Sequence, residues 1–191
     1  MNEFDDLDLL EDVENIEAQD EIDAHKGYPA TNVLVDEHMV IKKAIDILVD
    51  AVKNEIRNEQ LYLNLAKFFS EYADAIHHGK EEKILFEFLK EKRVPDHVLE
   101  IVKELENDHI KGRELVRKIR ENASSFEVMR DYALAYASML RDHILKEDEG
   151  LFRAMHPYLP KEEERKMMEE FRNADPPSKE ELERLVERFN R

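Results

Sequence analysis

Residues 77–86 read HHGKEEKILF and residues 143–152 read HILKEDEGLF. Each stretch has a histidine followed four residues later by a glutamate (His77 and Glu81, His143 and Glu147), and each ends in Leu-Phe. On an α-helix, side chains four residues apart lie on one face, about one turn from each other. The two stretches therefore predict two helices that each present an imidazole and a carboxylate to the same side. Their local resemblance indicates equivalent roles.

Apolar residues recur at spacings of three and four on both sides of these stretches, which is typical of helices that bury one face. The pattern predicts core helices at about residues 31–54, with Thr31 or Asn32 as the cap, at about 58–90, and from Pro95 to about residue 121. A fourth helix is expected to begin at a Ser124-x-x-Glu127 capping box and to end before Pro157. The short connections predict an all-α, antiparallel up-down-up-down four-helix bundle.

The chain is expected to divide into three parts. Residues 1–27 form an acidic N-terminal arm, which the sequence Gly27-Tyr28-Pro29 separates from the rest. Residues 28–160 form the four-helix bundle. Residues 161–191 form a C-terminal extension with short helices at about 161–173 and 178–189.

Composition excludes several classes of function. The net charge of −17 argues against binding to nucleic acid or to an anionic membrane surface, both of which favour basic proteins. The absence of cysteine excludes disulfides, thiolate metal sites and a cysteine nucleophile. No apolar run approaches the roughly 20 residues of a membrane span. The start of the chain is acidic, unlike a signal peptide, so the expected compartment is the cytoplasm.

Four histidines stand on apolar stripes, one on each predicted core helix: His38, His77, His109 and His143. A polar ring on the inner face of a helix is costly to bury unless something satisfies it. Together with Glu81 and Glu147, these rings predict the inner shell of a metal site inside the bundle. The alternative is a helical bundle with satisfied core histidines and no metal. Simple antiparallel geometry places His143 about six residues, or roughly 9 Å, from the level of His109.

A rival pairing lies within the first stretch, because His78 and Glu82 have the same spacing as His77 and Glu81. We prefer His77 and Glu81, which are in line with the apolar residue Phe69 and with Ala73 on the same stripe.

Two further features accompany the candidate donors. Gly79, Gly112 and Gly150 lie near them, and a helical glycine costs up to about 1 kcal/mol relative to alanine. These glycines indicate room for a ligand or close helix approach, unless they are merely tolerated. Three acids (Glu37, Asp108 and Asp142) each directly precede a candidate histidine. Adjacent helical residues diverge by about 100°, so each acid either reaches across to another helix or, as we expect, is solvated.

The motifs together resemble the hemerythrin-like, or HHE cation-binding, family over about residues 30–160. They are Val35-Asp36-Glu37-His38-x-x-Ile41, His77-His78-Gly79-Lys80-Glu81-Glu82-x-Ile84-Leu85-Phe86, Asp108-His109-x-x-Gly112-Arg113-x-Leu115-Val116 and His143-Ile144-x-Lys146-Glu147-x-x-x-Leu151-Phe152.

The resemblance implies a bundle that holds two iron ions in a non-haem, carboxylate-bridged centre. It implies that His38 and His77 cap one iron, that His109 and His143 cap the other, and that Glu81 and Glu147 bridge them. Such nitrogen and carboxylate donors also accept other divalent metals.

One departure from the family concerns Arg113. Hemerythrins proper have a second histidine at this position of the third helix, and arginine cannot ligate because it stays protonated. One iron is therefore expected to lack an imidazole, with a carboxylate, a tyrosine or water in its place, which leaves an open coordination position.

The function implied is the binding of a small ligand (oxygen, nitric oxide or peroxide) at this open iron position. The alternatives are a di-iron peroxidase or nitric-oxide-handling enzyme, and an iron- or oxygen-sensing regulatory module that acts through a protein partner.

Overall fold

The computed structural model describes residues 28–189, so the acidic arm predicted for residues 1–27 lies outside the described residues. Every regular element in the described range is helical, which confirms the all-α class. Among these residues, no helix combines the length and the apolar character that a membrane crossing requires.

Within residues 28–189, the helices follow one another as four long rods and two shorter helices. The first rod is α2 (Pro29–Lys53), and the third is α5 (Asp96–Glu121). The second rod consists of α3 (Glu59–Phe68), η1 (Phe69–His78), η2 (Glu81–Leu85) and α4 (Phe86–Glu91). The fourth consists of α6 (Phe126–Leu145), η3 (Lys146–Leu151), α7 (Phe152–Met155) and η4 (His156–Tyr158). The last two helices are α8 (Lys161–Ala174) and α9 (Lys179–Phe189).

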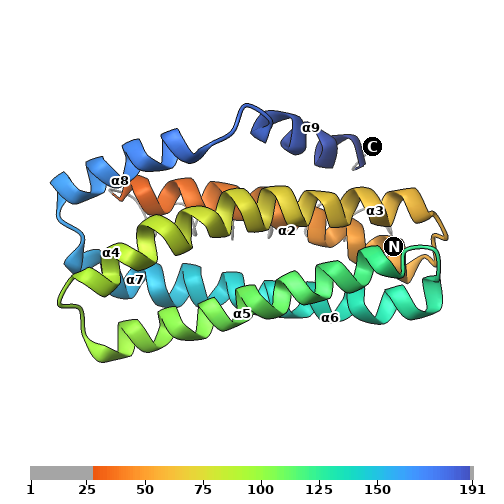
Figure 1. The fold of residues 1–191 in the computed structure, drawn as a ribbon, viewed down its shortest axis with the longest axis horizontal. Coiled ribbons are helices and arrows are strands. Elements are labelled where there is room, and N and C mark those ends of the chain that lie inside the picture. Colours follow the sequence, from red (N-terminus) through yellow and green to blue (C-terminus); the bar gives the residue numbers. More distant parts are fainter. Residues whose placement is uncertain (1–27, 190–191) are drawn as a thin grey trace, which may run out of the picture.

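Figure 1 shows the four rods lying side by side, with α8 and α9 running along one side of them. Helix α8 contacts α2 and η2, and α9 contacts α2 and η1. The C-terminal helices therefore cover the first two rods.

Two predicted caps are wrong. Helix α2 begins at Pro29, because a proline fits the first helical turn, where its missing N–H would have no partner. Thr31 lies inside the helix, and its hydroxyl donates to the carbonyl of Tyr28. At the start of α6 the cap residue is Ser125 and no side chain caps the helix, so the predicted Ser124 capping box does not form.

The second and fourth rods contain π-helical segments, in which hydrogen bonds run from residue i to i+5. These segments are η1, η2 and η3, and they include or adjoin both histidine–glutamate pairs. A π-helix has more residues per turn than an α-helix, so adjacent side chains diverge by a smaller angle. Isolated π-helical turns are frequent at functional sites. Here they allow the neighbours His77 and His78 both to be buried, at 1% and 5% exposure.

The core consists of two apolar clusters with a polar layer between them. One cluster contains Ile45, Phe69 and Leu140, and the other contains Leu34 and Leu105. The sequence positions between these clusters on each rod carry the buried histidines and glutamates. Burying ionisable groups in the middle of a core is costly unless they are paired or bind a cation, and this layer is the candidate site.

Candidate metal centre

Seven buried side chains form two groups that share one member. The first group is His38, His77, Glu81 and Glu147, and the second is His78, Glu81, His109 and His143. Within each group, one donor atom from each residue lies within 4.8 Å of the others. The structure therefore brings together all six residues singled out in the sequence, and it adds His78.

Six of the inner atoms of these groups lack hydrogen-bond partners within residues 28–189. They are Nε2 of His38 and His77 and both carboxylate oxygens of Glu81 and Glu147. A buried polar atom without a partner costs roughly 1–3 kcal/mol. Six such atoms facing one small volume are a set of donors that a cation would satisfy.

Each glutamate reaches toward both groups. The two oxygens of Glu81 lie 3.5 Å from Nε2 of His77 and 3.4 Å from Nε2 of His109. Those of Glu147 lie 3.2 Å from Nε2 of His38 and 3.1 Å from Nε2 of His143. A carboxylate with one oxygen in each of two donor sets has the geometry that bridging between two cations requires.

An outer layer of acids orients the histidines. The Nδ1 atoms lie at hydrogen-bond distance from Asp148 (2.8 Å from His38), Glu37 (3.0 Å from His77) and Glu82 (2.8 Å from His109). A histidine that donates its Nδ1–H to a carboxylate turns Nε2 the other way, and metal-ligating histidines are commonly held like this.

The remaining two histidines face acids at longer range, beyond hydrogen-bond distance. Nδ1 of His78 lies 3.6 Å from Asp74, and Nδ1 of His143 lies 3.9 Å from Asp108. All five rings therefore face a carboxylate on the outside of the centre.

Each outer acid is itself paired with a cation. The partners are Lys42 for Asp148 (3.5 Å), Lys80 and Lys179 for Glu37, Arg113 for both Glu82 (2.5 Å) and Asp74 (2.7 Å), and Lys146 for Asp108. The order from inside to outside is thus imidazole, carboxylate, ammonium or guanidinium.

The outer acids correct one expectation. Glu37 and Asp108, which precede His38 and His109 in the chain, reach across to His77 and His143 on other helices. Asp142 is exposed, as expected for a solvated residue. Sequence reasoning missed Asp148, Glu82 and Asp74. A signal was present for two of them, because Glu82 and Asp148 directly follow Glu81 and Glu147.

The Leu-Phe ends of the two stretches also have equivalent places. Phe86 is stacked on His109 with ring centroids 5.8 Å apart, and Phe152 is stacked on His38 at 5.9 Å. The resemblance between the two stretches thus extends from the donors to the aromatic rings that pack against them.

Electrostatics favours positive charge in the centre. Burial would lower the pKa of His38, but Asp148 and Glu147 outweigh it and raise the pKa to about 10. Burial acts in the same way on His109, and Glu81 and Glu82 raise its pKa to about 10. His78 differs, because burial and the neighbouring histidines hold its pKa well below the usual value. Acidic groups therefore retain protons on two imidazoles, and a metal cation could take the place of those protons.

The place of Arg113 bears on the expectation that one iron lacks an imidazole, which stays a prediction. Arg113 lies outside the centre, 41% exposed, and His78 adds a third imidazole to the second group. The sequence offers His77 and His78 as rival donors, and the π-helical turn buries both rings, although neighbours on a regular α-helix point apart. Glu82, the other half of the rival pairing, is an outer acid.

The expected difference in level between His109 and His143 does not keep their rings apart. Their Nε2 atoms lie 3.2 Å from each other. Helical side chains lean toward the N-terminus of their own helix. In consecutive antiparallel helices, this moves the ring on α5 away from the connecting turn and the ring on α6 toward it, so the two converge.

With buried imidazoles and shared carboxylates between its helical rods, this chain has the features of a metal-binding helical protein. The family model for the hemerythrin HHE cation binding domain matches residues 30–155, and the chain belongs to this family. The resemblance drawn from the motifs is confirmed. The comparisons with curated proteins and with solved structures gave no match.

Proposed function

We propose that this protein holds two iron ions in the buried centre and binds a small ligand, namely oxygen, nitric oxide or peroxide, at an open coordination position. The observation that carries the proposal is the sharing of carboxylates: Glu81 belongs to both groups, and Glu147 has one oxygen near a histidine of each. We further propose that the rods form the antiparallel up-down-up-down bundle, which the short connections between them support.

The first iron would be held by His38, His77, Glu81 and Glu147, and the second by His78, His109, His143 and Glu81. Mixed imidazole and carboxylate donors with free positions suit non-haem iron, although they also accept manganese or zinc. Iron, when bound, supplies reversible coordination of small ligands and one-electron chemistry. The chain supplies orientation, since the outer acids fix the rings, and it excludes water from the buried donors.

Metal analysis of the purified, reconstituted protein tests this proposal, together with absorption spectra under oxygen, peroxide and nitric oxide. We expect two iron ions per chain and a spectrum that responds to at least one ligand. Less than one equivalent of iron would contradict the di-iron centre. An iron-loaded protein that ignores all three ligands would contradict ligand binding and favour a sensing or structural role.

The sensing alternative has one observation in its favour. Lys179 of α9 lies 2.5 Å from Glu37, which is hydrogen-bonded to His77, so the C-terminal extension touches the outer layer of the first group. If the protein senses iron through this link, removing the metal should speed hydrogen exchange in α9. Unchanged exchange there would exclude this route. The division into three parts and the cytoplasmic location stay predictions, as does the peroxidase or nitric-oxide-handling alternative.

A further inference from the structure

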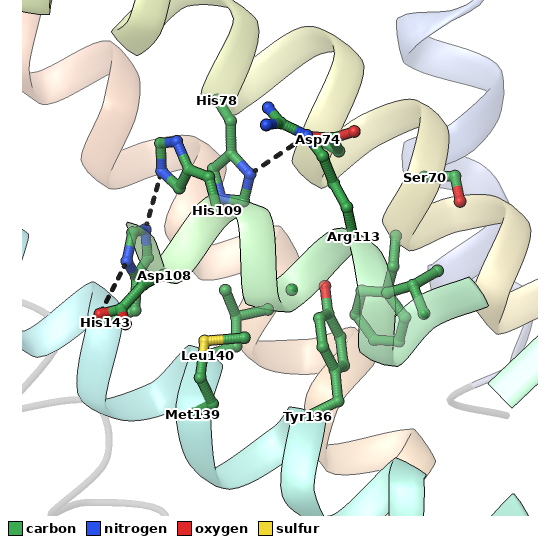
Figure 2. Close-up of a pocket in the computed structure, with 13 residues that line it drawn as sticks. Ser70, Asp74, His78, Asp108, His109, Arg113, Tyr136, Met139, Leu140 and His143 are labelled. Atoms are coloured by element: carbon green, nitrogen blue, oxygen red, sulfur yellow. Dashed lines mark hydrogen bonds and ion pairs between the residues drawn. The ribbon is translucent and has the colours of Figure 1, made fainter. Parts of the chain in front are cut away.

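A pocket of about 70 Å³ borders the second group and opens between the second, third and fourth rods. Its inner wall includes His78, His109 and His143, and Tyr136 and Met139 of α6 form much of its floor (Figure 2). Pockets for drug-sized ligands have about 300–1,000 Å³. This one suits a ligand of a few atoms.

The pocket adjoins only one of the two groups. Residues found solely in the first group (His38, His77 and Glu147) do not line it. Its contact with the centre consists of the three imidazoles of the second group, so a ligand in the pocket would approach the centre from that side.

Gly112 keeps this space open. A Cβ at position 112 would lie 3.3 Å from Cε of Met139 and 3.7 Å from Cε2 of Tyr136. Gly79 and Gly150 differ, because a Cβ would meet only one atom, at 3.9 Å, in the first and nothing within 4 Å in the second. Of the three glycines near the centre, Gly112 is therefore the one whose missing side chain leaves room for a ligand.

Tyr136 offers a hydrogen bond to whatever occupies the pocket. Its ring rises from α6 with the hydroxyl directed toward α5, and within the described part of the chain that hydroxyl has no hydrogen-bond partner (Figure 2). Burial and the nearby Asp74 carboxylate raise the pKa of the phenol, so the group keeps its proton and acts as a donor. Val116 and Leu140 add apolar surface to the pocket walls.

The outer side of the pocket carries charge. Arg113 is paired there with Asp74 and Glu82, at 2.7 and 2.5 Å. Arg113 is 41% exposed and lines the same pocket as Tyr136 and the histidines.

We propose that the pocket lined by Gly112 and Tyr136 is the chamber through which a small ligand with a hydrogen-bond acceptor reaches the second group, and that the Tyr136 hydroxyl donates to it. The proposal rests on the proposed function and names the route and the positioning residue that serve it.

The first test blocks the chamber. The Gly112→Leu variant and its matched control Gly150→Leu are loaded with iron, and the association rates of azide and nitric oxide are measured. We expect unchanged iron content in both and association slowed about tenfold or more in Gly112→Leu alone, because the added side chain overpacks the chamber. If Gly112→Leu fails to fold by circular dichroism, Gly112→Ala replaces it, since the atom nearest to the new Cβ is the flexible end of Met139.

Tyr136→Phe removes only the hydroxyl. We expect azide to dissociate about tenfold faster, which corresponds to the loss of one hydrogen bond, with the iron content unchanged. Unchanged dissociation would overturn the role of Tyr136.

A readout without iron uses crystals of the zinc-loaded protein under xenon pressure, because xenon enters small apolar cavities. Xenon beside Tyr136 in the wild type, and its absence in the glycine variant that folds, would support the chamber. Its absence in the wild type would overturn it. If iron-loaded wild type binds neither azide nor nitric oxide, the proposed function fails. If wild type binds them and the folded Gly112 variant binds them equally fast, the chamber alone fails.

Discussion

The two groups of the centre have similar donors but different surroundings. Around the first group, Glu37 is held by Lys179 of α9 and by Lys80, which is 0% exposed and also contacts Asp175 at 2.5 Å. The second group borders the Gly112–Tyr136 pocket, and its outer acids share the half-exposed Arg113. The added helices thus cover the outer layer of the first group, while that of the second group stays close to solvent. We interpret the first group as the better shielded and the second as the more accessible.

The largest expected effect comes from the residue that both groups share. Glu81→Ala should reduce iron from two equivalents to less than one, because each group loses a donor. His38→Ala, by comparison, should remove only the ion of the first group. Metal analysis of the two variants checks this, and equal losses would contradict the division into two groups.

The next effect distinguishes the two adjacent histidines. His78→Ala should remove the ion of the second group, and His77→Ala that of the first, so each variant keeps about one equivalent of iron. The double variant should bind almost none. If His78→Ala binds two ions, the third imidazole is not a ligand.

A smaller effect is expected from the outer layer. Lys179→Met removes a cation from Glu37. It should lower the affinity for the ion of the first group about 10- to 100-fold, as changes in the outer shell of a metal site commonly do. Arg184→Met is the matched control on the same helix, because Arg184 is exposed and its guanidinium pairs, within residues 28–189, with Glu180 alone. Competition with a chelator measures both affinities. A similar loss of affinity in the control, or a lower affinity for the second ion, would show that the effect is general destabilisation.

The smallest effect concerns pH. His38 and His109 have pKa values raised from 6.5 to about 10 in the metal-free protein. A raised pKa stabilises the folded state below the unfolded value, and this stabilisation is lost as pH rises through the folded value. The metal-free protein should therefore lose stability from about pH 6.5 to about 10, while metal affinity rises because fewer protons must be displaced. Melting and metal titrations at several pH values should show opposite slopes, and parallel slopes would contradict this assignment.

Much of this centre could be predicted from the sequence. The apolar stripes placed His38, His77, His109 and His143 on separate rods, because helical periodicity is a local property of the chain. The pair spacing also identified Glu81 and Glu147.

The remaining features of the centre depend on geometry that the periodicity of the sequence does not indicate. A regular α-helix sends His77 and His78 to different sides, so the π-helical turn that buries both was not foreseeable from the pattern. Glu37 and Asp108 pair with histidines of other helices. Such pairings depend on how each helix is rotated about its axis and shifted along it, and not on the spacing of residues in the sequence. The Lys179 contact depends on how the C-terminal helices pack, which no motif indicated.

The most direct test of a two-ion centre is anomalous X-ray scattering at the iron edge from crystals of the iron-loaded protein. We predict two peaks, one among His38, His77, Glu81 and Glu147 and the other among His78, His109, His143 and Glu81. A single peak, or a second peak away from His78, would contradict the account.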